Sequence, residues 1–321
     1  MGRPAIAGLV LTLLVQAPLA GQYPPTTPSQ AQAPSPVKLS GYIQAREVYQ
    51  SNIGLTASIN RARLSASGGI VQGVTWRVQG EFRTGSVGTG RASVSLQDAY
   101  VRYNPGAWAV QAGQFKTPFT REFIASLADI ETADRATAVD SLAPKRDIGL
   151  MAEYTYRRIG VWAGVFNGEG QNVTANTDST MLGVARLAVR VLPQLALGVN
   201  GARYFGDSTR YGVDAAYEDD RFALKGEYLG QARDEGAGPD NWGWYGLGAV
   251  YVIPAVQAVG RYEEFARPAV TTTVKNRSWT AGFNVYPSGR NLRLTFDYLS
   301  RRIGEPGVRK ARLLAQVQAR F

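Results

Sequence analysis

The chain has 321 residues and a formal charge of +10, and it contains neither Cys nor His. The lack of Cys excludes disulfides, thiolate nucleophiles and Cys-based metal sites, and the lack of His excludes the usual Ser-His and Cys-His catalytic arrangements. An enzyme built on this sequence would have to use carboxylates, Lys or Tyr alone, so no catalytic residue, metal site or cofactor is expected.

The first twenty residues have the form of an export signal. Arg3 gives a positive start, Ala5 to Val15 is a short apolar stretch, and residues 17–20 offer small side chains for cleavage, with residues 31–33 as a second candidate site. Residues 21–37 are rich in Pro, Thr, Ser, Gln and Ala, which predicts a periplasmic linker. No later stretch holds the ~18 to 20 uncharged apolar residues of a spanning helix. A membrane location would therefore require a closed barrel, in which all backbone groups are paired.

From residue 38 onward, the dominant pattern is an alternation of apolar and polar side chains with a period of two. In the last segment, apolar residues at odd positions from 311 to 321 alternate with polar ones, and Leu314 is the exception. Such a period puts apolar side chains on one face of a strand and charged ones on the other. About sixteen segments of this kind are predicted, near residues 39–49, 57–67, 74–83, 94–103, 108–114, 147–156, 159–166, 181–192, 196–204, 210–218, 222–229, 242–252, 256–263, 278–286, 291–300 and 309–321.

The connections between these segments alternate in length. Short turns are expected at residues 104–106, 156–158, 192–194, 218–220, 253–255 and 286–289, with 68–73 as the remaining turn. Longer polar, Gly-rich loops are expected at residues 84–92, 167–180, 230–241 and 266–276. Short turns on one rim and long loops on the other are typical of outer-membrane barrels. The pattern therefore predicts an all-β, transmembrane antiparallel β-barrel over residues 38–321. A soluble β-sandwich would not explain the signal, the even strand number and the two unlike rims together.

The arginines of the predicted strands indicate what the barrel interior contains. An Arg that faces lipid at the bilayer midplane costs about 2 to 4 kcal/mol, so these side chains are expected to face the lumen or lie near the rims. The residues on the inward face are Arg46, Arg61, Arg63, Arg77, Arg102, Arg186, Arg190, Arg261, Arg293 and Arg312. Such a lining concentrates anions, and Arg suits bidentate contact with phosphate or carboxylate.

An alternative interpretation is that these cations form structural pairs with inward carboxylates. The candidate partners are Glu81, Asp98, Glu153, Asp214, Glu227 and Asp297. Because the cations outnumber the carboxylates, net anion selectivity is still expected.

The connection from Phe115 to Arg146 is the third long loop and the longest one. About thirty residues without a strand are unusual in a compact domain unless the segment has a function. We expect this extracellular loop to fold into the pore and narrow it, with Ser126–Ile130 as a short helical piece; a surface loop or a subunit clasp is the alternative. Its cations, added to the expected pore-lining and anion-binding set, are Lys116, Arg121, Arg135 and Arg146.

Several motifs in and around this loop are distinctive. They are residues 113–122 (Gly-Gln-Phe-Lys-Thr-Pro-Phe-Thr-Arg-Glu), 130–135, 143–149, 61–64, 97–101 and 165–168, together with the terminal Phe321. With these motifs the chain resembles the phosphate-selective porin O and P family over essentially the whole barrel. The resemblance implies a sixteen-stranded, trimeric, anion-passing porin whose third loop forms the constriction.

Members of that family known for phosphate uptake use an inward ladder of Arg and a cluster of Lys. On the matching motifs, Arg61 and Arg63 would belong to the ladder and Lys116 would be a constriction cation. The chain departs from the pattern in two ways: Asn60-Arg61 stands where the family has a doubled Arg, and only five Lys follow Lys38. A Lys-based phosphate trap would then be thin or absent.

Taken together, these patterns predict a porin of the bacterial outer membrane, reached through the periplasm. It would give passive, anion-selective diffusion of small solutes, with phosphate or polyphosphate among the candidates. The expected partners are outer-membrane lipids, small anions and further copies of the chain in a homotrimer, and no nucleic acid. The alternatives are an outer-membrane barrel enzyme and a plugged structural or adhesive barrel.

Overall fold

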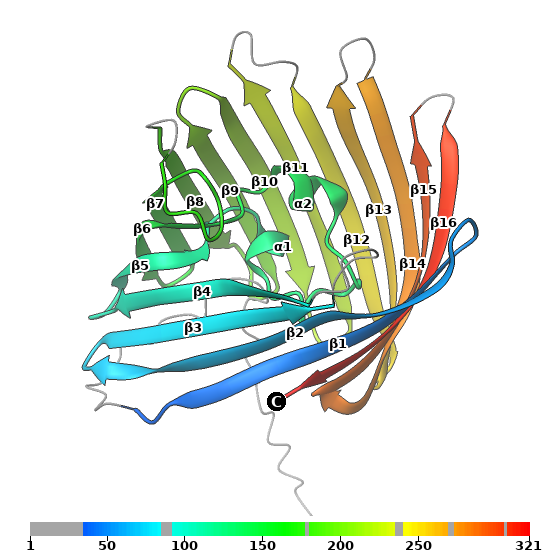
Figure 1. Ribbon diagram of the computed structural model, residues 1–321, viewed down its shortest axis with the longest axis horizontal. Helices are drawn as coiled ribbons and strands as arrows, with labels where there is room; N and C mark the ends of the chain where they lie inside the picture. Colours follow the sequence, from blue (N-terminus) through cyan, green and yellow to red (C-terminus); the bar gives the residue numbers. More distant parts are fainter. Residues whose placement is uncertain (1–34, 85–91, 177–179, 235–239, 269–272, 305–306) are drawn as a thin grey trace, which may run out of the picture.

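The computed structural model describes residues 35–84, 92–176, 180–234, 240–268, 273–304 and 307–321. Within these ranges, sixteen strands form one closed antiparallel barrel in which each strand is bonded to the next and β1 is bonded to β16 (Figure 1). The expected signal at 1–20 and most of the expected linker at 21–37 lie outside the described residues. No helix in the described part of the chain is long and apolar enough to cross a membrane.

The strands are β1 (Lys38–Gln50), β2 (Gly54–Val71), β3 (Val74–Arg83), β4 (Ser93–Tyr103), β5 (Trp108–Lys116), β6 (Arg146–Tyr156), β7 (Ile159–Phe166), β8 (Leu182–Arg190), β9 (Leu195–Tyr204), β10 (Ser208–Glu218), β11 (Phe222–Arg233), β12 (Asn241–Ile253), β13 (Val256–Pro268), β14 (Thr273–Arg290), β15 (Leu292–Ile303) and β16 (Val308–Arg320). Two short helices, α1 (Arg121–Ile124) and α2 (Thr137–Leu142), lie between β5 and β6. The end of the barrel that carries the connections β2–β3 and β14–β15 is called the turn end below, and the opposite end is called the loop end.

The pairing of β1 with β16 completes the closed barrel that the sequence predicts. Their register runs from Tyr42 opposite Arg320 to Gln50 opposite Arg312. Beyond the strand, the backbone of Phe321 exchanges two hydrogen bonds of 2.9 and 3.1 Å with Gly41. The closed ring of strands has no open edge, and a sheet in lipid must have none because every backbone group has to be paired.

The two faces of the wall follow the predicted alternation. On β11, Phe222 and Leu224 are exposed on the outside, whereas Glu227 is buried on the inside. On β16, Leu313 and Val317 are exposed on the outside and Gln316 is buried. Burying charge in the lumen and leaving apolar side chains on the outer surface is the reverse of a soluble protein and matches a barrel surrounded by lipid.

Several strands are longer than predicted. β11 continues to Arg233 and β13 to Pro268, so the loops expected at 230–241 and 266–276 are shorter than predicted. β14 also runs through the turn expected at 286–289, because a register shift between Val285 and Ser288 absorbs the irregular residues. Gly and Pro mark bulges here rather than strand ends.

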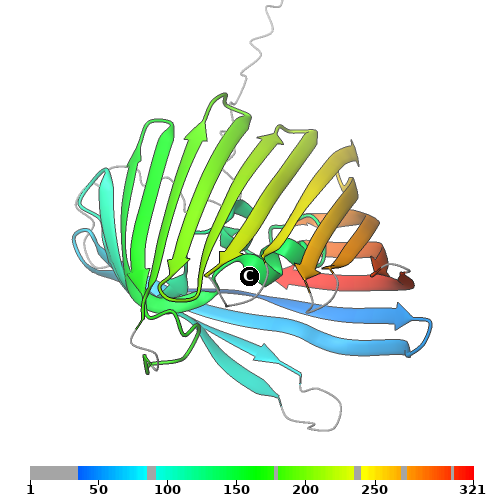
Figure 2. The same ribbon diagram turned by 90° about the horizontal axis from the view of Figure 1, so that it is seen from above.

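The chain between β5 and β6, residues 117–145, is called the inner segment below. Both views draw its helices α1 and α2 within the ring of strands (Figures 1 and 2). Phe119, Phe123, Val139 and Leu142 are buried and belong to one apolar cluster with inward side chains of the wall, such as Phe166. The hydrophobic core of this barrel therefore lies inside it, between the inner segment and the wall.

Candidate pore and its charged lining

The inner segment is anchored by inward carboxylates that accept hydrogen bonds from its backbone. Glu227 Oε1 accepts from the Glu122 N–H at 2.6 Å, and Asp297 Oδ2 accepts from the Ala133 N–H at 2.8 Å. Glu263 accepts from both the N–H and the hydroxyl of Thr137. Glu227 and Asp297, the candidate partners of inward cations, thus hold backbone amides.

Inward arginines of the wall donate hydrogen bonds to carbonyl groups of the same segment. Arg261 Nη1 donates to the Asp134 carbonyl at 2.8 Å, and Arg293 Nη1 donates to the Ile130 carbonyl at 2.7 Å. Arg46 Nη2 donates to the Ala133 carbonyl at 3.1 Å. These cations come from β13, β15 and β1, so they attach the segment to one arc of the wall, which runs from β13 through β16 to β1.

The predicted helical piece at Ser126–Ile130 is wrong, because these residues form a turn. The Ser126 hydroxyl accepts from the Ala128 N–H at 3.2 Å, and the Ser126 carbonyl accepts from the Asp129 N–H. Such local side-chain bonds compete with helix formation. The Ala128 carbonyl instead accepts from Gln318 and Arg320 of the wall.

Two cations of the predicted site stabilise α1 directly. Lys116 Nζ donates to the carbonyls of Ile124 and Ala125 at 2.9 and 2.7 Å, and Arg135 also donates to the Ala125 carbonyl. Both lie over the ring of Phe123. Burial lowers the pKa of Arg135 to about 10, which leaves its guanidinium positive at neutral pH.

A second group of predicted cations forms buried ion pairs with carboxylates. Arg186, whose side chain is fully buried, binds Asp214 through both head-group nitrogens at 2.6 and 3.0 Å. Arg121 Nη1 lies 3.3 Å from Glu218 Oε2. Arg102 Nη2 lies 2.9 Å from Oε2 of Glu153 on β6. These pairs are structural networks of the kind considered as the alternative above.

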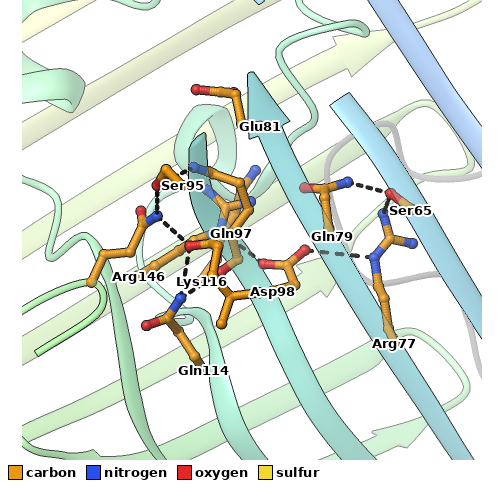
Figure 3. A network of polar contacts seen from close by, with 12 residues as sticks. Ser65, Arg77, Gln79, Glu81, Ser95, Gln97, Asp98, Gln114, Lys116 and Arg146 are labelled. Atoms are coloured by element: carbon orange, nitrogen blue, oxygen red, sulfur yellow. Dashed lines mark hydrogen bonds and ion pairs between the residues drawn. The ribbon is translucent and has the colours of Figure 1, made fainter. Parts of the chain in front are cut away.

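A third group lines the wall formed by β2, β3 and β4. Arg61, Arg63 and Arg83 gather around the single carboxylate of Glu81. Asp98 lies between Arg146 and Arg77, at 2.8 and 3.5 Å (Figure 3). Each carboxylate is therefore shared by two or three guanidinium groups, and an excess of positive charge remains on this wall.

Two cavities of more than 300 Å³ border the inner segment among the described residues. The loop-end cavity, of about 350 Å³, is lined among others by Arg61, Arg135, Arg261, Arg301, Arg312 and Asp134. The turn-end cavity, of about 320 Å³, is lined among others by Arg63, Arg77, Tyr100, Gln111, Lys116 and Arg146. Both therefore lie between the inner segment and a wall of inward cations.

The cations predicted from the sequence divide accordingly. Those that line one of these two cavities are Arg61, Arg63, Arg77, Lys116, Arg135, Arg146, Arg261 and Arg312. Those that lie elsewhere are Arg46, Arg102, Arg121, Arg186, Arg190 and Arg293. Sequence reasoning missed Arg301, Tyr100 and Gln111. Arg301 continues the inward alternation of Arg293 past the predicted strand end, so that signal was present.

Comparison with solved structures fits this architecture. The fold is similar to the anion-selective porin from Comamonas acidovorans, with a TM-score of 0.68 at 14% identity over 89% of this chain and 100% of that chain. It is also similar to the outer membrane channel DcaP of Acinetobacter baumannii, with a TM-score of 0.65 at 15% identity over 90% of this chain and 98% of that chain. OmpT of Vibrio cholerae, in a trimer form, gives a TM-score of 0.68 at 12% identity over 90% and 100%. No curated protein sequence matches the chain.

A closed barrel of sixteen antiparallel strands with a charged lumen defines this protein as an outer-membrane porin. Residues 41–200 match the family model described as phosphate-selective porin O and P. The chain belongs to this family, as the motifs in the sequence indicated.

Proposed function

We propose that the porin gives passive, anion-selective passage to small solutes. The observation that carries this proposal is the charge balance of the two cavities. The loop-end cavity is lined by five arginines and by Asp134 and Asp140. The turn-end cavity is lined by three arginines and Lys116, against Asp98 and Asp129. Lining of one sign raises the local concentration of ions of the opposite sign.

In this proposal, the passage lies to one side of the barrel axis, because the inner segment fills the other side. The inner segment is bonded to β1, β13 and β15, and its apolar cluster packs against β7. At the turn end, the remaining route lies beside β2, β3 and β4, where Arg63 and Arg77 line the cavity. At the loop end, it lies between Arg61 of β2 and the side of the wall that carries Arg301. The inner segment would then be an extracellular loop that folds back and forms the constriction, with Arg135 on one side and Arg61 on the other.

Phosphate is one candidate solute, in keeping with the description of the family. Guanidinium groups bind phosphate oxygens in pairs, and the arginines around Glu81 and Asp98 are spaced along the route. The assembly we propose is a homotrimer in the bacterial outer membrane, reached through the periplasm with residues 1–20 as the export signal and 21–37 as a linker before the barrel domain.

The test compares two neighbouring arginines of β15. Arg301 lines the loop-end cavity, whereas Arg302 is exposed on the outside of the same strand. In planar bilayers with a KCl gradient, Arg301→Gln should move the reversal potential toward cations and Arg302→Gln should leave it unchanged. Equal effects of the two variants would contradict the proposed lining. Cation preference in the wild type, or no current together with no liposome swelling, would overturn the channel assignment, and the last result would favour a plugged barrel.

A further inference from the structure

We propose that the turn-end cavity is a subsite for aromatic carboxylates. This inference rests on the proposed anion channel and specifies one class of solute for it. Beside its cations, the cavity is lined by Tyr100, Phe115 and Ile124. These apolar side chains stand beside guanidinium groups, so a flat organic anion can contact both kinds of surface.

The cation and the aromatic ring stand next to each other on neighbouring strands. Arg77 of β3 is the register partner of Tyr100 of β4, and both side chains line the cavity. Register partners in an antiparallel pair have Cβ atoms about 4.5 to 5.5 Å apart. A carboxylate bound to Arg77 would therefore place an attached ring within reach of Tyr100.

The half-buried Tyr100 ring packs against one aromatic neighbour and meets no side chain at its register position on β5. Phe115 meets it edge-on, with ring centroids 6.0 Å apart and planes at 80°. Its register partner on β5 is Gly113, which has a φ of +125°. A Cβ at Gly113 would lie 2.2 Å from the Ala99 carbonyl oxygen, so this position must be glycine and presents no side chain beside the ring.

Arg77 is the most accessible of the cations that share carboxylates at this cavity. Its side chain is 33% exposed, compared with 8% for Arg146 and 5% for Arg63. Arg77 and Arg146 share the one carboxylate of Asp98. The pair of guanidinium groups therefore keeps one positive charge in excess, which suits the single negative charge of a monocarboxylate.

Gln111 adds a polar contact at the same place. It is 1% exposed and lines the cavity from β5, two residues before Gly113. Neither its amide nitrogen nor its amide oxygen has a hydrogen-bond partner among the described residues. Buried polar groups are nearly always bonded, and each exception calls for an explanation. A hydroxyl group on the ligand's ring would supply both a donor and an acceptor to this amide.

The experiment measures block of the chloride current through the full-length channel in planar bilayers by benzoate, acetate and phosphate. Stacking on an aromatic ring predicts that benzoate blocks at a concentration about tenfold lower than acetate does. Tyr100→Leu should raise the half-blocking concentration of benzoate about fivefold and leave that of acetate unchanged. Tyr103→Leu is the matched control, because Tyr103 is exposed on the outside of the same strand. Gln111→Leu should weaken block by 4-hydroxybenzoate more than block by benzoate.

The outcomes separate this inference from the proposed function. An anion-selective wild-type channel on which benzoate and acetate act equally would overturn the subsite and leave the anion channel standing. Equal weakening by Tyr100→Leu of the block by benzoate and of the block by acetate would also overturn the subsite, because the Tyr100 ring would then affect block only by supporting the fold of the channel. A phosphate block stronger than the benzoate block would assign the cavity to inorganic anions instead. A channel without anion preference would overturn the proposed function itself.

Discussion

Asp134 is the carboxylate whose removal should change the selectivity of the channel most directly. Its two oxygens lie 3.0 Å from Arg46 Nη1 and 3.0 Å from Arg312 Nη2, at the edge of the loop-end cavity. Burial alone would raise the pKa of Asp134, but these two arginines hold it below its ordinary value. Asp134 is therefore ionised at neutral pH, and Asp134→Asn removes one full negative charge and leaves both arginines without their counter-ion.

The size of the effect follows from Coulomb's law. A unit charge about 6 Å from a permeating ion contributes roughly 0.7 kcal/mol in a water-like dielectric. Salt at about 0.1 M, with a Debye length of about 10 Å, reduces this to roughly 0.4 kcal/mol. That energy raises the local anion population about twofold and lowers the cation population about twofold. The anion-to-cation permeability ratio of Asp134→Asn should therefore rise about fourfold.

The assay is the reversal potential in a KCl gradient at neutral pH. The control is Asp220→Asn, which removes the same charge from the exposed turn between β10 and β11. A ratio that stays unchanged or moves toward cations would refute the assignment of the loop-end cavity to the ion path. The pKa of Asp134 lies below the ordinary value of 3.8 for Asp. Protonation of Asp134 should therefore increase the anion preference of the wild type only at a pH below that value.

Three further predictions concern how the inner segment is held. Asp214→Ala leaves Arg186 buried without its carboxylate partner. The free energy of unfolding, measured in urea, should fall by about 3 to 5 kcal/mol, and ion selectivity should not change. A shift of selectivity at unchanged stability would place Arg186 on the ion path. Gly243→Ala puts a Cβ 2.7 Å from Ala138 Cβ of α2 and should lower the free energy of unfolding by about 1 to 3 kcal/mol. A second substitution, Ala138→Gly, should restore part of that stability. If it restores none, the strain lies in the sheet alone. Burial raises the pKa of Glu122, so its carboxylate destabilises the fold increasingly as the pH rises above the ordinary value of 4.5. Glu122→Gln should then melt at a higher temperature than the wild type at pH 7, with a gap that closes toward pH 4; a lower melting temperature at pH 7 would contradict this.

Most strands of the barrel wall could be predicted from local sequence patterns. The predicted segments 74–83 and 159–166 match β3 and β7 at both ends, because a two-residue period bounded by turn residues fixes register and boundaries together. β14 was underestimated, since the residues that signal a turn from 286 to 289 are accommodated by a bulge within a continuing strand. Whether such residues end a strand depends on the neighbouring strands, which a single segment does not reveal.

The lining of the pore could be predicted only in part. Lipid penalises outward cations, so the inward direction of Arg77 and Arg186 follows from alternation alone. Their different surroundings do not follow from it. The Arg186 side chain is fully buried and paired with Asp214, whereas a third of the Arg77 side chain is exposed at a cavity. The difference depends on where the inner segment packs, and that is decided by contacts with strands far away in the sequence.

Gln318 shows what the closing pair of strands implies for folding. Its amide oxygen accepts from Gln44 of β1, 274 positions earlier, and its amide nitrogen donates to the Ala128 carbonyl of the inner segment. Contacts of such long range are slow to form, since the chain entropy between the two partners must be lost first. One buried side chain thus joins the first strand, the last strand and the inner segment. Pairing of the first and last strands and docking of the inner segment therefore depend on the same side chain and should occur together, late in folding.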